Sequence, residues 1–497
     1  MRLKASTQQS KLEKEENKAL RWTICQECQG AGKKSRRLHK RVRQHLQEEF
    51  DQFEKLVEEG KAPIRPNCHL HNCETCKGAG LLAAASDPIA DQENFPHVAI
   101  IGGGIGGVAL AVACLHRQIP FTLYERDAGF EVRSQGYGLT LQQASKAIEG
   151  LGIFSLKEGV NSNRHVMHTP DGKVLGEWGM RKRLEAGIVT NPKRTNIHIA
   201  RQALRLALLE QLGGHDAVTW GHQLIDLKEM EGEGVSLSFK VDGKIKQVQA
   251  DLVVGADGIR SAVRHIILGE NSSPLRYLGC IVILGICPLS ALDGLESPLL
   301  DAATVFQTAN GHERIYIMPY TADAVMWQLS FPMTEHEAKA LSAQGPEALK
   351  AAAIRSVPWH TPIPQILAAT QSAQVSGYPV YDRALLDTKL LAPWEKVTLI
   401  GDAAHPMSPF KGQGANQALL DALSLARAIV TGCRPMSTWR KEGIRKSVLT
   451  TFEVDMMVRC ASKVKGSAEA ADFLHSEIVL DEGDRPRGGH LRDAMKV

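Results

Sequence analysis

Short apolar runs separated by segments of helical spacing recur over most of the chain after residue 96. The runs HVAII, DLVVG and VTLIG have the continuous apolar character of strands that are buried on both faces, as in a parallel sheet. Between these runs, apolar residues stand three and four positions apart, which is the spacing of helices that pack on a core. This alternation predicts an α/β fold with a parallel sheet.

Two stretches interrupt the alternation, residues 165–197 and residues 271–375. They contain runs such as ERIYIMPY and AVMWQLSFP, which are better suited to antiparallel strands. We therefore expect a second, mainly antiparallel β-sheet domain interleaved with the first. The α/β domain would consist of the three segments 97–164, 198–270 and 376–461.

The two ends of the chain have other patterns. Residues 1–82 are rich in cysteine, and apolar positions at helical spacing predict a helix over 38–57. A polar, small-residue stretch over 83–96 is interpreted as a linker. The polar region 462–497 is expected to be frayed or disordered.

A basic run covers residues 33–43, with seven Lys or Arg and no acidic residue. The formal net charge of the whole chain is only +4, so charge gives no case for nucleic acid as the main partner. We interpret the run as a solvated helix face, with binding of an acidic protein or RNA as the alternative. The first twenty residues lack the apolar segment of a secretory signal, which predicts a cytoplasmic protein.

Two near-copies of one motif bracket the predicted N-terminal helix, CQECQGAG at 25–32 and CETCKGAG at 73–80. A C-x-x-C turn brings two thiolates together, and two such turns complete a tetrahedral zinc site. Because four thiolates would fill the coordination shell, the site would be structural. The predicted ligands are Cys25, Cys28, Cys73 and Cys76.

The motif resembles the C-x-x-C-x-G-x-G zinc knuckles of DnaJ-type chaperones. Those proteins have four such motifs and two zinc ions, whereas this chain has two motifs, so chaperone activity is not implied. Two alternatives stay open. Cys68, His69 or His71 could replace one thiolate, or the cysteines could form a reduced or redox-active pair without zinc.

The segment HVAIIGGGIGGVALAVACL combines an apolar strand, a glycine turn and a small-residue helix. Gly102, Gly104 and Gly107 have the G-x-G-x-x-G spacing that lets a pyrophosphate approach a helix N-terminus. A second strand ends at Glu125, where a carboxylate would accept hydrogen bonds from a ribose. Together these features predict FAD or NAD, and the glycine pattern fits this turn better than a membrane span.

Two later strands run into aspartates, in DLVVGADGIR at Asp257 and in VTLIGDAAHP at Asp402. With the glycine turn, these segments resemble the signature motifs of the FAD-dependent aromatic hydroxylases, the single-component flavoprotein monooxygenases. The resemblance covers about residues 97–430 and implies a Rossmann-like FAD-binding domain with an interleaved substrate domain.

The resemblance also implies roles for individual residues. Asp402 would hold the ribityl chain, and Asp257 would lie where FAD and the nicotinamide donor come near each other. Arg201 resembles a flavin-contacting arginine, although an ordinary solvated helix residue is the alternative. The ADP half of FAD would be bound by Gly102, Gly104, Gly107, Glu125 and Arg126.

A helix is predicted to begin within the run PFKGQGAN, because apolar residues at helical spacing follow it. Its N-terminus would point at the flavin, where backbone N–H groups stabilise the negative charge of the reduced ring. The cofactor-binding residues predicted here are Pro409, Gly412, Gly414, Ala415 and Asn416.

The activity implied by the resemblance is hydroxylation of an aromatic or other small organic substrate by NADH or NADPH and O2, through a flavin C4a-hydroperoxide. The sequence reveals no general base, since His165, His168, His198 and His405 each lack a recognisable partner. The substrate pocket is expected in the interleaved domain, with ordinary sheet packing as the alternative for each residue. The candidate pocket residues are Tyr316, Met318, Trp327 and Gln328.

Three other classes of protein are alternatives. A flavin-dependent halogenase would carry a Trp-x-Trp-x-Ile motif, and no two of the seven tryptophans are two residues apart. A plain NAD(P) dehydrogenase would explain the glycine turn but leave Asp257 and Asp402 without a purpose, and a flavin- or NAD-dependent oxidoreductase without oxygen insertion stays an alternative. A partner-binding protein that uses the cysteine segment is the third alternative.

Overall fold

The computed structural model describes residues 21–37, 41, 42, 44, 68–86, 88–132, 137–185, 196–232, 234–269, 272–292, 294–433, 438–484 and 486. The chain packs as two compact units, Met1–Ile89 and Ala90–Val497. The division between them falls inside the stretch that we interpreted as a linker. The last strand of the first unit extends to Ala84, slightly beyond the predicted boundary at residue 82.

The N-terminal unit contains two antiparallel strand pairs. Its strands are β1 (Arg21–Ile24), β2 (Lys33–Arg37), β3 (Cys68–Asn72) and β4 (Leu81–Ala84). β1 pairs with β4, and β2 pairs with β3. The prediction of a helix face for the basic run is therefore wrong at residues 33–37, because pairing with β3 holds them in a strand. Of the helix predicted over 38–57, Arg41, Val42 and Gln44 are helical, and the other positions lie outside the described residues.

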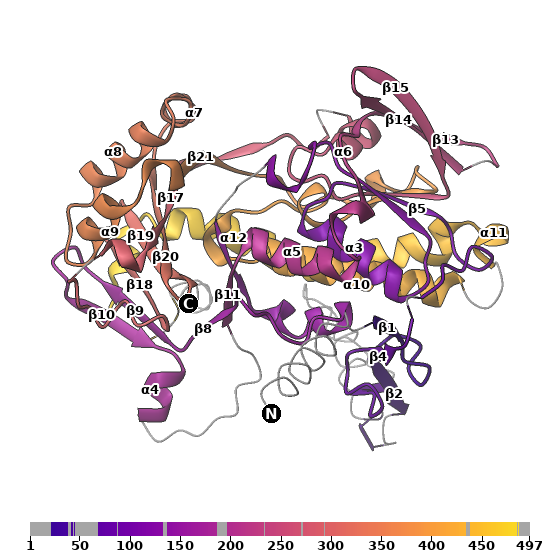
Figure 1. Ribbon diagram of the computed structural model, residues 1–497, viewed down its shortest axis with the longest axis horizontal. Coiled ribbons are helices and arrows are strands. Elements are labelled where there is room, and N and C mark those ends of the chain that lie inside the picture. The colour runs from indigo at the N-terminus through magenta and orange to yellow at the C-terminus, as the bar shows by residue number, and fades with distance from the viewer. Residues whose placement is uncertain are drawn as a thin grey trace, which may run out of the picture. The chain divides into compact units, whose positions relative to one another are not determined.

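The parallel sheet predicted for the larger unit is confirmed. It has five strands in the order β12-β6-β5-β16-β22, and every pair in it is parallel. The apolar runs are buried because helices cover the sheet (Figure 1). The strands are β5 (Val98–Ile101), β6 (Phe121–Tyr124), β12 (Val218–Thr219), β16 (Leu252–Gly255) and β22 (Val397–Leu399). The helices are α3 (Ile105–His116), α5 (Arg201–Gln211), α6 (Ala262–Leu268) and α10 (Gly414–Cys433).

The interleaved antiparallel sheet is also confirmed, with the order β10-β9-β18-β19-β20-β17-β21 and one parallel pair, β9 with β18. We call it the substrate sheet. Three helices cover one of its faces, namely α7 (Glu335–Ala343), α8 (Pro346–Ser356) and α9 (Ile363–Ala369) (Figure 1). Its strands are β9 (Arg164–His168), β10 (Val174–Trp178), β17 (Arg276–Pro288), β18 (Thr304–Ala309), β19 (Arg314–Thr321), β20 (Ala324–Pro332) and β21 (Val375–Asp382).

Two three-stranded antiparallel sheets complete the strands described in this unit. The first has the order β7-β11-β8, with β7 (Gly138–Leu141), β8 (Val160–Ser162) and β11 (Asn196–Ala200). The second is formed by β13 (Gln223–Met230), β14 (Gly234–Val241) and β15 (Lys244–Ala250). The short helix α4 (Met180–Glu185) follows β10.

The prediction of a frayed tail over 462–497 is wrong for residues 462–480, while residues 485 and 487–497 lie outside the described residues. After α11 (Thr438–Glu442), the helix α12 (Thr450–Phe473) continues well into the predicted tail. Phe473, Leu474 and Val479 are buried against the strands β9 and β10. Polar residues interrupt the apolar positions of α12, among them Lys463 in the cavity wall and the exposed Lys465, and so they hid its buried side in the sequence. Among the described residues, no helix combines the length and apolar character needed to cross a membrane.

Candidate active site

The glycine turn lies between β5 and α3, and its three glycines have different surroundings. A Cβ atom on Gly107 would lie 1.8 Å from the carbonyl oxygen of Gly102, so only glycine fits there. Gly102 has a φ of 110°, and a Cβ atom there would lie 2.6 Å from the Ala256 oxygen. A Cβ atom on Gly104 would meet nothing within 4 Å. Because Gly104 is the N-cap of α3 without a side-chain cap, the open space lies beside the unpaired N–H groups of the helix.

Glu125 follows β6 and supports this turn from the side. Its carboxylate accepts hydrogen bonds from Gly103 N at 2.7 Å and from Asp127 N at 3.0 Å. A carboxylate can accept more than two hydrogen bonds, so Glu125 could accept another from a ribose hydroxyl. Arg205 of α5 donates from Nε to the oxygen of Gly103 at 2.7 Å. Sequence reasoning missed this arginine, because it lies among the apolar residues of a helix.

A cavity of about 1130 Å³ connects the glycine turn with the substrate sheet. Its volume is slightly above the usual range of about 300–1,000 Å³ for ligand pockets. Four of the predicted cofactor residues do not line it, namely Gly102, Gly107, Glu125 and Asn416. The other nine do, and these are Gly104, Arg126, Arg201, Asp257, Asp402, Pro409, Gly412, Gly414 and Ala415.

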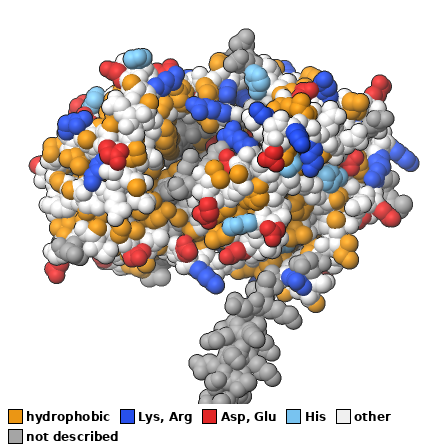
Figure 2. Space-filling model, turned by 45° about the horizontal axis from the view of Figure 1, so that its top comes forward, with side chains coloured by type: hydrophobic (Ala, Val, Ile, Leu, Met, Phe, Trp, Pro, Cys, Tyr) orange, Lys and Arg blue, Asp and Glu red, His pale blue; other side chains and the backbone are white. Residues whose placement is uncertain are grey.

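Cationic side chains dominate the cavity wall. Among the described residues, the carboxylates that line it are those of Asp257 and Asp402. Figure 2 shows a hollow on one face of the molecule with Lys and Arg side chains gathered beside it. A wall of this charge suits a ligand with a diphosphate group. The six cationic lining residues are Arg126, Arg201, Arg260, Arg314, Lys411 and Lys463.

The two aspartates of the later motifs are used differently. The carboxylate of Asp257 accepts from Ser261 Oγ at 2.5 Å and from Ala262 N at 2.6 Å, so it binds the N-terminus of α6. Its predicted place near the nicotinamide donor stays a prediction. The side chain of Asp402 is exposed to the cavity. It is therefore available to a ligand, unlike the occupied carboxylate of Asp257.

Asn416 acts as a clamp between α10 and the segment that follows β7. Its Oδ1 accepts from Gln142 N at 2.9 Å and from Ala144 N at 3.1 Å. Its Nδ2 donates to the oxygens of Thr140 and Gly412, each at 2.9 Å. Because the oxygen and the nitrogen of its amide both form these hydrogen bonds, Asn416 holds the N-terminus of α10 against the segment that follows β7.

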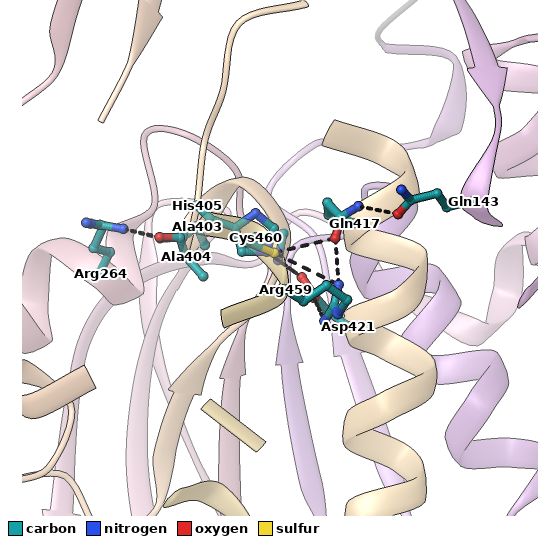
Figure 3. Close-up of polar contacts among 10 residues, drawn as sticks. Gln143, Arg264, Ala403, Ala404, His405, Gln417, Asp421, Arg459 and Cys460 are labelled. Carbon is teal, nitrogen blue, oxygen red and sulfur yellow. Dashed lines mark hydrogen bonds and ion pairs between the residues drawn. The ribbon is translucent and has the colours of Figure 1, made fainter. Parts of the chain in front are cut away.

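A buried polar network lies behind the loop that carries Asp402 (Figure 3). Asp421 of α10 accepts from His405 Nε2 at 2.7 Å and from Gly401 N at 2.8 Å. Arg459 of α12 donates to the other oxygen of the same carboxylate at 2.7 Å. On the far side, Arg264 donates to the oxygens of Ala403 and Ala404 at 2.8 Å and 2.9 Å. The interpretation of His405 as a lone histidine is therefore wrong, since its partner is sixteen residues away along the chain.

The network holds charges in the protein interior. Burial alone favours neutral His405, but the charge and hydrogen bond of Asp421 outweigh it and raise the pKa of His405 to about 10. Burial likewise opposes ionisation of Asp421, yet His405 and Arg459 hold the pKa of this carboxyl below its usual range. Burial lowers the pKa of Arg264 to about 10. The loop before α10 is thus fixed by a buried ion pair at neutral pH.

Asp421→Asn is expected to make stability less dependent on pH in the alkaline range. The folded pKa of His405 is about 10, above its ordinary value of 6.5. Its stabilising contribution is therefore fully present below pH 6.5 and is lost as the pH rises through about 10. Without Asp421, this contribution of protonated His405 and its loss at alkaline pH both disappear. The free energy of unfolding at neutral pH falls by about 3–5 kcal/mol.

Chemical denaturation of both proteins across this pH range measures the effect. Asp226→Asn is the control, because Asp226 is a half-buried acid of β13 that pairs with the exposed Lys228. The control is expected to keep the wild-type dependence on pH. A wild-type dependence in Asp421→Asn as well would contradict the assignment to His405.

The candidate pocket residues divide between the two faces of the substrate sheet. Tyr316, Met318 and Gln328 line the cavity. Trp327 does not, because its side chain packs under α7–α9 and its Nε1 donates to Thr370 Oγ1 at 2.9 Å. The expectation of sheet packing therefore holds for Trp327.

The remaining histidines are also located. His165 lines the cavity and stacks on Trp178, with ring centroids 5.7 Å apart. His198 is buried between Thr140 Oγ1 at 3.0 Å and Ser162 Oγ at 2.7 Å. Burial lowers the pKa of His198 to about 3, so it is neutral in the folded protein. His168 is buried in β9 beside His360, and its pKa is lowered to about 4, chiefly by burial.

The four predicted zinc ligands converge in the N-terminal unit. The Sγ atoms of Cys25 and Cys73 are 3.9 Å apart, those of Cys28 and Cys76 are 3.7 Å apart, and all four lie within 4.8 Å of one another. A tetrahedron with Zn–S bonds of about 2.3 Å has edges of about 3.8 Å. The spacing of the sulfur atoms therefore fits zinc.

The surroundings of the cysteines support the same geometry. Gly32 N and Gly80 N donate to the Sγ atoms of Cys28 and Cys76, each at 3.2 Å. Cys25 N donates to the Gly80 oxygen at 2.9 Å, and Cys73 N donates to the Gly32 oxygen at 3.0 Å. The two copies of the motif are thus related by an internal two-fold arrangement. His71, one of the alternative ligands, is exposed, and the side chains of the other two lie outside the described residues.

Comparisons with known proteins agree with this geometry. The model of the FAD binding domain family matches residues 96–434. A protein of Stigmatella aurantiaca named Aurachin C monooxygenase/isomerase is 30% identical over 67% of this chain and 80% of its own length. The 3-amino-4-hydroxybenzoate 2-monooxygenase PtnB3 of Streptomyces platensis is 31% identical over 67% of this chain and 78% of its own.

A solved structure shows the same fold. Klebsiella pneumoniae HpxO complexed with FAD and uric acid superposes with a TM-score of 0.63 and 21% sequence identity, covering 80% of this chain and 95% of that one. The resemblance seen in the sequence is therefore confirmed by a family model and by curated relatives. The chain belongs to the FAD binding domain family and is an FAD-dependent monooxygenase.

Proposed function

We propose that this monooxygenase uses NADH or NADPH and O2 to hydroxylate an aromatic or other small organic substrate. The observation that carries the proposal is the cavity, which joins the glycine turn and the α10 N-terminus to one face of the substrate sheet. When bound, FAD would supply the redox chemistry of the reaction, for which the nicotinamide provides two electrons and O2 provides one oxygen atom to the substrate and the other to water. A single cavity would bring cofactor and substrate into contact.

The chain's own residues would bind and orient the cofactor. The open space beside Gly104 and the N-terminus of α3 suits the pyrophosphate, and Glu125 suits the adenosine ribose. Asp402 is exposed to the cavity and suits the ribityl hydroxyl groups. Arg201 would contact the flavin, and the first N–H groups of α10 would stabilise negative charge on it.

The substrate would lie against the substrate sheet. Met318 and Met326 give this wall an apolar surface that excludes water, while Tyr316 and Gln328 offer polar groups. One relative is named for a hydroxybenzoate, and HpxO was solved with uric acid. These names support a planar ring as the substrate of this chain as well.

The visible spectrum of the purified protein is expected to contain oxidised flavin. Oxidation of NADH or NADPH in air should accelerate when a suitable aromatic compound is added, because substrate binding is coupled to cofactor reduction. Incorporation of one atom of 18O from 18O2 into the product tests the reaction directly. Nicotinamide oxidation that yields only hydrogen peroxide with every compound would favour an oxidoreductase without oxygen insertion.

We also propose that the N-terminal unit binds one structural zinc ion through its four cysteines. The sulfur spacing and the paired N–H bonds to sulfur support this role. Four thiolates would leave no coordination position for a substrate, so the metal would stabilise the unit without taking part in catalysis. A cytoplasmic location and an acidic protein or RNA partner for residues 33–43 stay predictions.

A further inference from the structure

The strand β10 forms one edge of the substrate sheet (Figure 1), and a C-terminal segment lies along that edge. This segment consists of residues 481–484, and we call it the strap. Gly483 N donates to the Leu175 oxygen at 2.9 Å, and Glu177 N donates to Asp484 Oδ1 at 3.0 Å. The strap therefore runs parallel to β10 and supplies hydrogen-bond partners to an edge strand.

Two ion pairs on the outside of the molecule fasten the strap. Lys173 Nζ lies 2.7 Å from Glu482 Oε1, and Lys182 Nζ lies 2.6 Å from Asp484 Oδ2. All four side chains are exposed to solvent. Ion pairs of this kind contribute little to stability, and salt screens them. A local fluctuation can therefore break the attachment without unfolding the domain.

The segment before the strap is held more firmly. It is η11 (Glu477–Leu480), in which Val479 is fully buried and packs with Met167 and Leu175 of the substrate sheet. Burial of an apolar side chain does not depend on ion pairs, so η11 keeps its place when the charges of the strap are screened. A detaching strap would therefore pivot where η11 ends.

The strap leads to the wall of the cavity. Its parallel course carries Pro486 toward Gly179, and both residues line the cavity, as does Trp178 of β10. Lys182 belongs to α4, which begins directly after Gly179. The ion pair of Lys182 with Asp484 thus holds the strap across this part of the wall. Detachment of the strap would take Pro486 out of the wall and open the cavity beside Trp178.

We propose that the strap is a gate through which the substrate reaches the cavity. When attached to β10, it would close the cavity beside Trp178 and exclude water during the reaction. When detached, it would let substrate enter and product leave. This inference rests on the proposed function, because it takes the cavity as the site of the reaction. The strap would contribute no group to the chemistry.

Hydrogen exchange in the full-length, FAD-loaded protein tests the attachment of the strap. The amides of Gly483 and Glu177 exchange when the strap opens, because each donates a hydrogen bond across it. In the double variant Lys173→Gln, Lys182→Gln they should exchange about 2- to 30-fold faster, which is the effect of losing two exposed ion pairs. Lys465→Gln is the control, because Lys465 is an exposed lysine of α12 with an ion pair of its own. The control should exchange as wild type does.

Quenching of the flavin fluorescence by acrylamide tests the gate itself, because this small neutral molecule must reach the flavin through the cavity. The Stern–Volmer constant should be higher in the double variant than in wild type or in Lys465→Gln. Wild type should approach the double variant in about 1 M salt, which screens exposed charges.

Faster exchange without stronger quenching would overturn the proposal, since the strap would then only cover the edge of β10. Equal exchange in the double variant and in wild type would overturn it as well. A protein that holds no flavin would instead count against the proposed function, whereas the exchange rates would still report the attachment of the strap.

Discussion

Replacing Gly107 with alanine is expected to abolish retention of FAD and to destabilise the α/β domain by at least about 3 kcal/mol, at the upper end of the usual cost of overpacking. The new Cβ atom would lie 1.8 Å from the carbonyl oxygen of Gly102, and the backbone of both residues is held by β5 and α3. The helix must therefore move away from the sheet. Flavin content after gel filtration and the free energy of unfolding measure the two effects.

Gly104→Ala separates the scaffold from the binding site. Its Cβ atom would meet no protein atom within 4 Å, and its φ of −75° suits alanine. Its fold should therefore remain intact. FAD should nevertheless bind about 10- to 150-fold more weakly, the equivalent of about 1–3 kcal/mol of overpacking, if the pyrophosphate occupies that space. Gly129→Ala, which also meets nothing within 4 Å, is the control and should bind FAD as wild type does. Unchanged FAD affinity in Gly104→Ala would contradict the proposed phosphate site.

The fold was predictable where the chain repeats a simple pattern. The strands β5, β16 and β22 are buried on both faces, so their sequences are continuously apolar and could be recognised directly. The alternation in β19 and β20 likewise revealed antiparallel strands. It did not reveal which face of β20 lines the cavity, because Trp327 and Met326 are both apolar and both buried.

The remaining failures share a physical cause, which is tertiary contact between distant segments. His405 and Asp421 are brought together by the turn before α10, and no local pattern marks an ion pair of that kind. The strand β2 has the sequence KKSRR, whose polar character gives no strand signal, and pairing with β3 alone holds it in place. The buried side of α12 was masked for a related reason, since Lys463 and Lys465 interrupt its apolar positions.

Among substitutions in the N-terminal unit, removal of one zinc ligand is expected to destabilise that unit most. Cys73→Ala leaves three thiolates, so the metal should be lost and the unit should unfold. The strand pairs β1-β4 and β2-β3 are short, and structural zinc contributes about 10–16 kcal/mol to the folding of comparable small domains. Metal content per chain and hydrogen exchange of the amides of Cys25 and Cys73, which bond across the two motifs, report the loss.

The flavin should be retained in the same variant, because the N-terminal unit packs separately from Ala90–Val497. Cys433→Ala is the matched control, since Cys433 is the buried last residue of α10 and is remote in sequence from both motifs. It should keep both zinc and flavin. If the cysteines are instead a redox-active pair, wild type will contain no metal, and mild oxidation will join Cys25 to Cys73 or Cys28 to Cys76, whose sulfur atoms are 3.9 Å and 3.7 Å apart. Zinc content of the untreated protein therefore decides between the two chemistries before any variant is made.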